Sequence, residues 1–301
     1  MIAFTEKQKR EHADDMEQLT RRRGQWRDTL RRLLRNKLAV LGLIIVVVIV
    51  LGVVFANFLT PYAYDAQDYG ARFSYPSLEH PLGTDNFGRD LLSRILYGGR
   101  ISLLVALLAL LISVVIGVFL GATAGYFGGK YEVAVMRIMD VIMAIPGLLL
   151  AVAISAGLGT GVFNTALAIS IAGIPPSVRM LRATVLQIRD EEYVEAARAT
   201  GAGNMRIIFH HVLPNTIAPL IVDSTLRIGI NILQISSLSF VGLGIQPPTP
   251  EWGSILSAGR AYIQDFWPLI TFPGVAIMLT LLGFNLLGDG LRDALDPRLK
   301  R

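Results

Sequence analysis

Six segments of this 301-residue chain are each long and apolar enough to cross the hydrocarbon core of a bilayer, which takes about 20 residues of helix. Hydrophobic residues make up 52% of the sequence and charged residues 17%, and a soluble domain of this size could not bury six such segments. The sequence therefore predicts an all-α, polytopic membrane protein with six transmembrane helices. The predicted spans are residues 38–59, 101–124, 133–157, 162–181, 216–244 and 269–288.

Lys and Arg are unevenly distributed along the chain, and this predicts its orientation. The residues before Leu38 contain 11 of the 28 basic residues, which places the N-terminus in the cytoplasm by the positive-inside rule. Six crossings return the C-terminus to the same side and leave residues 189–214 there too. Because the basic residues lie beside span ends, where they retain topology and meet anionic lipid, the pI of about 9.6 does not indicate a nucleic-acid partner.

This topology divides the chain into five parts. They are a cytoplasmic segment at 1–37, the first transmembrane helix at 38–59, an external segment at 60–100, a core of five transmembrane helices at 101–288, and a cytoplasmic tail at 289–301. Within the first part, Trp26, Leu30, Leu33 and Leu34 form an apolar stripe, which is typical of an amphipathic helix on the membrane surface. A merely solvated tail is the alternative.

The external segment has its own helical pattern. Leu91, Leu92, Ile95 and Leu96 oppose a polar side, which predicts an interfacial helix that ends at Gly98-Gly99. Farther along, the aromatic residues Trp252, Tyr262 and Trp267 lie between the last two predicted spans. We interpret these three as interfacial anchors on the same side.

Glycine and proline predict details of two spans. Gly117, Gly121 and Gly125 repeat at the GxxxG spacing, which lets a second helix approach the backbone closely. Pro146-Gly147 lies in the middle of the third span, where the missing N–H of proline permits a kink.

A polar island separates the fourth and fifth spans. Residues 189–214, which we call the docking hairpin, read as two short helices with a glycine turn at Gly201. Asp190 is a possible cap for the first helix, and Asn204 starts a second helix that Pro214 ends. The local pattern fits both an ordinary surface hairpin and a docking element, because small residues let another surface approach the first helix.

The fifth span contains charge. Asp223 and Arg227 are one helical turn apart, so they can pair within one helix, and unpaired charge at this depth is costly. Asn231 and Gln234 continue the polar pattern farther along the span. The functional interpretation is a gate or a path wall, and the structural one is a locked pair that holds the helix orientation.

The sequence lacks the signatures of catalysis. No GxxxxGK[ST] motif is present, so the chain has no phosphate-binding loop of its own. It contains no Cys, and the adjacent His210 and His211 do not share a helix face and are poor joint metal ligands. We therefore predict no catalytic residue, no metal site and no enzymatic activity.

The docking hairpin also carries a family pattern. Glu195-Ala196-Ala197, Gly201 after three further residues, and Leu213-Pro214 resemble the EAA loop with which the membrane subunits of bacterial ABC importers dock on their ATPase. The family has an Ile where this chain has His211. The sequences HPLGTDNFGRDLLSRILYGGR, before the second span, and FNLLGDGLRDALDPRLKR, at the C-terminus, resemble the second permease of dipeptide, oligopeptide and nickel importers.

The resemblance implies a type I importer permease fold in a bacterial or archaeal plasma membrane, which is the inner membrane of a Gram-negative cell. It implies a heterodimer with a sister permease, two ATPase subunits that use ATP and Mg, and an external substrate-binding protein, with no cofactor bound directly by this chain. It assigns coupling to Glu195, Ala196, Ala197, Gly201, Leu213 and Pro214, and it favours peptides as substrate, with nickel and glutathione as alternatives.

Two other classes remain as alternatives. A secondary transporter would show repeated halves with broken helices at the midplane, and the chain has no clear internal repeat. A membrane scaffold without transport activity would need no polar residues in the fifth span.

Overall fold

The computed structural model describes residues 28–295, which are helical throughout apart from loops and one isolated bridge between Thr84 and Asp90. This confirms the predicted all-α class. The first half contains α2 (Lys37–Val54), α3 (Ala56–Leu59), η1 (Tyr69–Ala71), α4 (Leu91–Phe127), α5 (Gly129–Met143) and α6 (Gly147–Leu158). The second half contains α7 (Val162–Ile188), α8 (Glu192–Ala199), α9 (Asn204–Ile207), η2 (Ile208–Val212), α10 (Leu213–Phe240), α11 (Trp252–Gly259), η3 (Arg260–Tyr262) and α12 (Pro268–Leu295).

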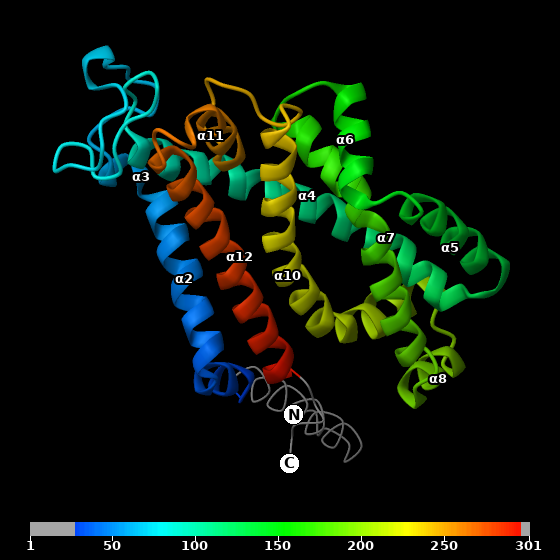
Figure 1. Cartoon of the computed structure of the whole chain (residues 1–301). Coiled ribbons are helices and arrows are strands. Elements are labelled where there is room, and N and C mark those ends of the chain that lie inside the picture. Colours follow the sequence, from blue (N-terminus) through cyan, green and yellow to red (C-terminus); the bar gives the residue numbers. More distant parts are fainter. Residues whose placement is uncertain (1–27, 296–301) are drawn as a thin grey trace, which may run out of the picture.

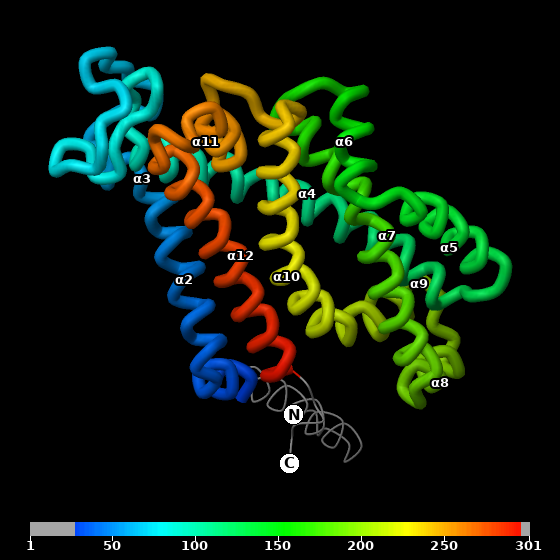
Figure 2. The backbone as a smooth tube through the Cα atoms, in the orientation of Figure 1, coloured from blue at the N-terminus to red at the C-terminus, as the bar shows by residue number. Residues whose placement is uncertain are grey.

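The two ends of the described chain meet at one end of the helical bundle. Residues 28–35 form a helix whose Leu33 packs with Ala39 and Ala294, and Asn36 caps α2 by accepting hydrogen bonds from the amides of Leu38 and Ala39. Of the predicted apolar stripe at the N-terminus, Trp26 lies outside the described residues. Figures 1 and 2 show α8 at this same end, while α11 and the loop before α4 lie at the opposite end.

The number of apolar spans is smaller than the sequence predicts. Among the described residues, four helices are long and apolar enough to cross a membrane: Lys37–Val54, Leu91–Phe127, Asn204–Phe240 and Pro268–Leu295. The pair α5 and α6 makes a fifth if it counts as one span. The remaining predicted span is α7, which has 27 residues but is less apolar because Pro175-Pro176 and Arg179 interrupt its hydrophobic run.

The third predicted span is divided into two helices at the proline where the sequence predicts a kink. Helices α5 and α6 meet at an angle of 83°. The break falls at Pro146, whose ψ of 130° is not helical and which directly precedes the first residue of α6. Since proline lacks an N–H and disfavours a helical conformation in the residue before it, the helix stops here and restarts in a new direction. The predicted kink is thus confirmed.

Helix α4 begins ten residues before the predicted second span, and it contains no separate interfacial helix. Asp90 caps its start, and the helix then runs through Gly98-Gly99 without a stop. A Cβ atom at Gly99 would lie 2.5 Å from Val53 Cγ2 and 2.8 Å from Trp252 Cζ2. These glycines therefore permit close contact with α2 and α11, and our prediction that they end a helix is wrong.

The predicted GxxxG packing is confirmed, and its partner is α7. A Cβ atom at Gly117 would lie 2.5 Å from Ser177 Cβ, and one at Gly121 would lie 2.7 Å from Leu181 Cβ. These distances are shorter than any real contact between such carbons, so only glycine permits this separation of the two helices. Among the helices of the described range, α4 and α7 form the most extensive contact.

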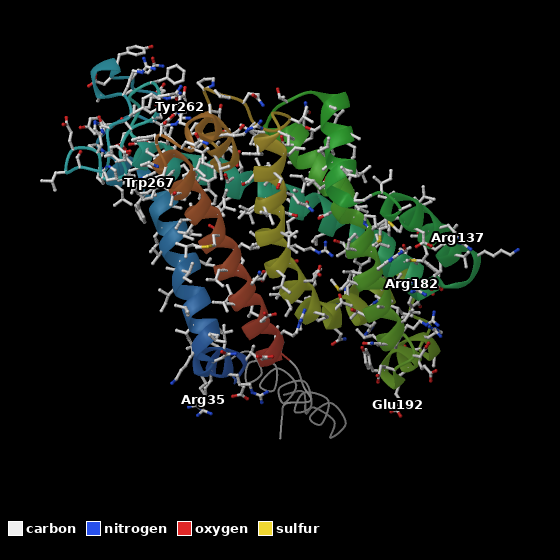
Figure 3. All side chains as sticks on the ribbon, in the orientation of Figure 1. Arg35, Arg137, Arg182, Glu192, Tyr262 and Trp267 are labelled. Carbon is white, nitrogen blue, oxygen red and sulfur yellow. The ribbon has the colours of Figure 1, made fainter. Side chains whose placement is uncertain are left out.

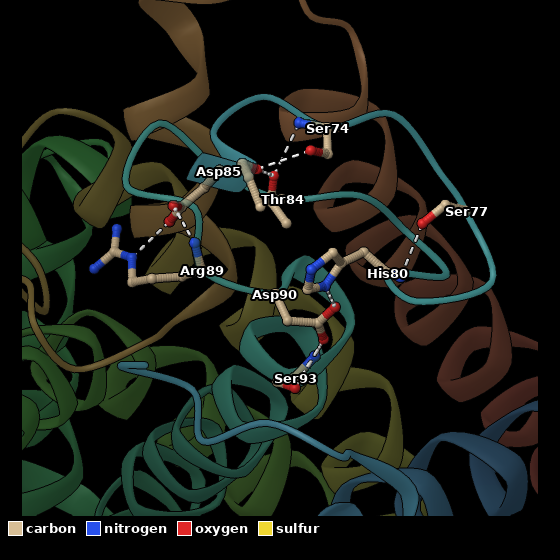
Figure 4. A network of polar contacts seen from close by, with 9 residues as sticks. Ser74, Ser77, His80, Thr84, Asp85, Arg89, Asp90 and Ser93 are labelled. Carbon is tan, nitrogen blue, oxygen red and sulfur yellow. Dashed lines mark hydrogen bonds and ion pairs between the residues drawn. The ribbon is translucent and has the colours of Figure 1, made fainter. Parts of the chain in front are cut away.

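Buried polar groups fasten the segment before α4 to the start of that helix (Figure 4). Asp85 accepts a hydrogen bond of 2.7 Å from Nε of Arg89, and His80 Nδ1 lies 3.0 Å from Asp90 Oδ1. Asp90 Oδ2 also accepts from the amide and hydroxyl of Ser93. All these side chains are buried, so the segment is a folded structure on the end of the bundle.

The aromatic anchors are only partly as predicted. Figure 3 shows Tyr262 and Trp267 at the end of the molecule away from Glu192 and Arg35, and Trp267 is 49% exposed. Trp252, by contrast, is 1% exposed, and its Nε1 donates to the carbonyl of Ile95 at 2.8 Å. The prediction that Trp252 is an interfacial anchor is therefore wrong, because this indole packs inside the bundle.

Candidate functional site

The docking hairpin is tied to the end of α4 as well as to α7, from which it emerges. Arg189 Nη1 donates to the carbonyl of Gly125 at 3.0 Å, and the Tyr126 hydroxyl donates to Asn204 Oδ1 at 3.2 Å. The guanidinium of Arg198 lies 5.9 Å from the centre of the Tyr126 ring. Tyr126 is not among the predicted site residues, although an aromatic residue next to the end of a predicted span is a signal that could have indicated it.

Helix α8 has one buried position and an exposed outer side. Val194 is fully buried against Val185, Ile207 and Ile208. Of the predicted coupling residues, Glu195 and Ala196 are exposed, while Ala197 is half-buried beside the hairpin core. Glu195 and Ala196 therefore lie on the exposed side of α8, and the buried Val194 anchors the opposite side of the helix.

The turn after α8 requires glycine for its backbone conformation. Gly201 has φ of +82°, and a Cβ atom there would have no heavy atom within 4 Å. Its amide donates to the carbonyl of Arg198, and the next amide, of Ala202, donates to Ala197. The backbone of Gly201 is in the left-handed region, and no neighbouring atom would clash with a side chain there. Any other residue would therefore be disfavoured by backbone strain alone, which agrees with the glycine turn that the sequence predicts.

The rest of the hairpin corrects two predictions. Asp190 does not cap α8, which has no side-chain cap, and instead lies 3.2 Å from Nε of Arg189. Pro214 does not end the second helix either, since α9 continues through the π-helical η2 into α10. The amide of Leu213 donates to the carbonyl of Ile208, and this wider turn lies directly before the proline that lacks a donor.

Leu213 and Pro214 therefore belong to the hairpin's junction with α10. Leu213 is half-buried against the hairpin core, and Pro214 is exposed at the start of α10. His211, at the position where the family has Ile, is half-buried, and its carbonyl accepts from Nδ2 of Asn215 at 2.7 Å. The same Asn215 amide donates to the hydroxyl of Tyr193, which joins α8 directly to α10.

A hollow of about 470 Å³ lies at the break between α5 and α6. The break contributes Met143, Pro146 and Gly147, and α7 contributes Ala172, Gly173 and Pro176. The wall from α10 contains all four residues predicted for a gate or path, namely Asp223, Arg227, Asn231 and Gln234. The structure thus brings these four to one surface, opposite the broken helix.

The charges in this hollow are paired. Arg227 Nε lies 2.5 Å from Asp223 Oδ2, and the two side chains are 17% and 27% exposed. Asn231 donates to the carbonyl of Ala106 on α4 at 3.2 Å. The predicted pairing within one helix is confirmed, and both charged groups remain reachable from the hollow.

Two ion pairs between α5 and α7 were not predicted. Arg179 Nη2 lies 2.5 Å from Asp140 Oδ1, and Arg182, labelled in Figure 3, pairs with Glu132. They join the segment before the break to the helix that enters the docking hairpin. Their partners are about 40 to 50 residues apart in sequence, so no local pattern indicates them.

The described part of the chain offers no metal centre, since residues 28–295 contain no group of three His, Asp or Glu side chains that could hold an ion. The candidate site consists of an exposed hairpin joined through α7 and α10 to a partly polar hollow among the helices. A hollow of this kind between membrane-length helices is typical of a membrane transport subunit.

Comparisons with known proteins give the family. Residues 117–301 match the family described as "Binding-protein-dependent transport system inner membrane component", and residues 24–81 match the "N-terminal TM domain of oligopeptide transport permease C". The chain belongs to this family, the permeases of ABC importers, and is therefore a multi-pass membrane protein.

Individual relatives agree with this assignment. The chain is 47% identical over 275 residues, or 91% of its length and 90% of the relative's, to the dipeptide transport system permease protein DppC of Alkalihalophilus pseudofirmus. It is 43% identical over 284 residues, 92% of each chain, to the glutathione transport system permease protein GsiD of Escherichia coli.

A solved structure shows the same fold. The inward-facing MetNI methionine ABC transporter matches with a TM-score of 0.55 and 19% identity, covering 67% of this chain and 97% of that one. This likeness supports the type I importer permease fold expected from the sequence.

Proposed function

We propose that this chain is the second permease of a peptide importer, and that it forms the translocation path together with a sister permease. The hollow between α10 and the broken span would be this subunit's part of the path. Asp223, Arg227, Asn231 and Gln234 would form its polar wall. In a bacterial or archaeal plasma membrane, the end of the bundle that carries the docking hairpin would face the cytoplasm.

One observation carries the proposal: the docking hairpin connects the two helices that line the hollow. Helix α7 enters the hairpin and η2 leads from it directly into α10, and both helices contribute to the wall of the hollow. A displacement of Glu195, Ala196, Ala197 and Gly201 would therefore reach the path through two continuous helices, while Leu213 and Pro214 lie at the joint. Rigid-body movement of packed helices is a direct way to convert such a displacement into alternating access.

The partners follow from this mechanism. Two cytoplasmic ATPase subunits, which would use ATP and Mg, would grip the docking hairpins of the two permeases, and an external binding protein would deliver substrate. This chain itself would bind no cofactor and hydrolyse nothing. Peptides are the proposed substrates because a relative that matches nine-tenths of the chain is named for dipeptide transport, and glutathione is the alternative because another such relative is named for glutathione transport.

The substitution Gly201→Val tests the coupling role, and Gly203→Val is its matched control. Both glycines are exposed and open to a side chain, but Gly201 has φ of +82° while Gly203 has φ of −64°. A β-branched residue is strained only at the first position, by about 1–2 kcal/mol or more. We expect Gly201→Val to abolish peptide uptake by the reconstituted complex with normal membrane insertion, and Gly203→Val to retain more uptake. Normal uptake by Gly201→Val would refute the assignment.

The substrate is tested separately. We expect the complex reconstituted with its binding protein to import labelled dipeptides in an ATP-dependent manner, and nickel or glutathione would be the competing cargo. Import of nickel alone would contradict the peptide assignment while leaving the importer mechanism intact.

A further inference from the structure

A second hollow, separate from the proposed path, lies between α4 and the junction of the docking hairpin. Its volume is about 320 Å³. One wall is the stretch of α4 from Val114 to Thr123, and the other is formed by Met205, Ile208, Phe209 and Leu213. No local sequence pattern indicates this pairing, because the two walls are about 90 residues apart in the chain.

The lining of this hollow is apolar apart from the hydroxyl of Thr123, which already has hydrogen-bond partners. Val115, Phe119, Met205 and Phe209 are each more than half exposed, so they cover one another only in part. The hydroxyl of Thr123 donates to the carbonyl of Phe119 at 2.7 Å and lies 3.0 Å from the Tyr131 hydroxyl. A hollow with such a lining offers no hydrogen bonds to water and favours a hydrocarbon occupant.

The dimensions favour a single hydrocarbon chain. The wall from Val114 to Thr123 is about 14 Å long at the helical rise, close to the thickness of one leaflet's hydrocarbon layer, about 15 Å. One extended acyl chain of a leaflet spans the same length, so a single chain fits along this wall.

Basic residues next to the lining residues in the chain indicate which lipid class would bind. Arg206 directly follows the lining residue Met205, is exposed, and takes part in none of the ion pairs among residues 28–295. Tyr126, three residues after the lining residue Thr123 on α4, has the guanidinium of Arg198 at 5.9 Å from its ring centre. Basic groups beside a gap between helices at the cytoplasmic surface attract anionic lipid headgroups.

We propose that this hollow binds one acyl chain of an anionic phospholipid from the inner leaflet, with the phosphate beside Arg206. The inference rests on the cytoplasmic position of the docking hairpin in the proposed function. Its consequence concerns coupling, because Ile208 and Phe209 belong to the π-helical η2 and Leu213 is the first residue of α10, so all three lie where the hairpin joins α10. A bound chain would support this joint, so uptake would depend on anionic lipid.

The test uses the intact complex in bilayers of phosphatidylcholine that contain phosphatidylglycerol with a photoreactive group on its acyl chain. Photolysis followed by peptide mapping should label residues 114–123 and 205–213 more strongly than the lipid-exposed helix α2. Val118→Trp, which fills the hollow, should remove this labelling, whereas the matched substitution Val48→Trp on the exposed side of α2 should not. Arg206→Gln should reduce labelling by phosphatidylglycerol about fivefold and leave labelling by a phosphatidylcholine probe unchanged.

Three results would overturn the proposal. They are equal labelling of α2 and the hollow, full labelling of Val118→Trp, and a cross-link to the sister permease from a photoreactive amino acid placed at Phe119. Co-purification of the ATPase and peptide uptake are measured on the same samples. An intact, active complex without the label contradicts only the lipid site, whereas a chain that never associates with an ATPase contradicts the proposed function.

Discussion

At the scale of single residues, Glu251 shows how a buried carboxylate organises one end of the bundle. Its side chain is fully buried, and it caps α11 by accepting from the amides of Gly253 and Ser254, each at 2.9 Å. The hydroxyl of Ser102 on α4 donates to the same carboxylate at 3.1 Å. Both oxygens are thus acceptors, and the residue joins α11 to α4.

Glutamine at this position should destabilise the protein. One of its terminal atoms is an –NH2 group, which cannot accept from the amide donors that meet Glu251. We expect Glu251→Gln to reduce the free energy of unfolding by about 1–3 kcal/mol, measured as a lower melting temperature of the purified complex. Glu79→Gln is the matched control, because Glu79 is exposed and its substitution should have no effect.

The same residue predicts a pH dependence. Burial raises the pKa of Glu251 above its ordinary value of 4.5, and the surrounding donors offset only part of this rise. A pKa raised by folding gives stability that is complete below the unfolded value and is lost as the pH rises through the folded value. The melting temperature of the wild type should therefore fall as the pH rises above 4.5. Glu251→Gln has no titrating group at this position, so the difference in melting temperature between the wild type and the variant should shrink as the pH rises. A difference that stays constant would show that Glu251 does not cause the pH dependence.

At the scale of elements, the contact between α4 and α7 depends on individual glycines. Gly121 on α4 has no room for a side chain, since a Cβ atom would lie 2.7 Å from Leu181 Cβ and from the carbonyl oxygen of Val178. Gly173 on α7 belongs to the same contact, but a Cβ atom there would lie 3.4 Å from Ser113, an ordinary separation.

Alanine should therefore have opposite effects at these two positions. Gly121→Ala pushes the two helices apart and should reduce stability by about 1–3 kcal/mol. Gly173→Ala should be neutral or stabilise by up to about 1 kcal/mol, since alanine favours helix. Denaturation of the purified complex in detergent measures both, and equal effects would contradict the close-packing explanation.

Two elements show why a local pattern mislocated helix ends. Glycine pairs usually end helices, but Gly98-Gly99 are inside α4 because α2 and α11 approach its backbone there. Proline usually ends a helix as well, but here the helix continues past Pro214. The wider π-helical turn of η2 directly before it accommodates a residue that has no N–H to donate. In both places a contact or turn outside the local pattern decided the outcome.

At the scale of the whole molecule, the Asp223–Arg227 pair distinguishes a path wall from a structural lock. Each single neutralisation, Asp223→Asn or Arg227→Gln, leaves its partner charge unpaired, and we expect a lower yield of assembled complex, with a cost of about 1–3 kcal/mol. The double exchange, Asp223→Arg with Arg227→Asp, restores the pair but reverses the charges that face the hollow.

We expect the double exchange to restore the yield of the complex but not peptide uptake. Yield is measured by co-purification of all subunits, and uptake with labelled dipeptide in the same membranes. Full recovery of both would show that the pair only holds the helix in place, and it would remove these two residues from the proposed path.

The sequence alone determined the helical membrane class, the family, the docking hairpin with its turn at Gly201, the glycine contacts of α4, and the pairing of Asp223 with Arg227. Each of these features depends on the length of an apolar segment or on a spacing of a few residues. In a helix, such a spacing directly determines which side chains lie on the same face. Only the tertiary structure decided the 83° angle between α5 and α6, the burial of Trp252 and Glu251, and the two hollows. Those features arise where segments far apart in the chain compete for the same space, and that competition is settled by packing rather than by local pattern.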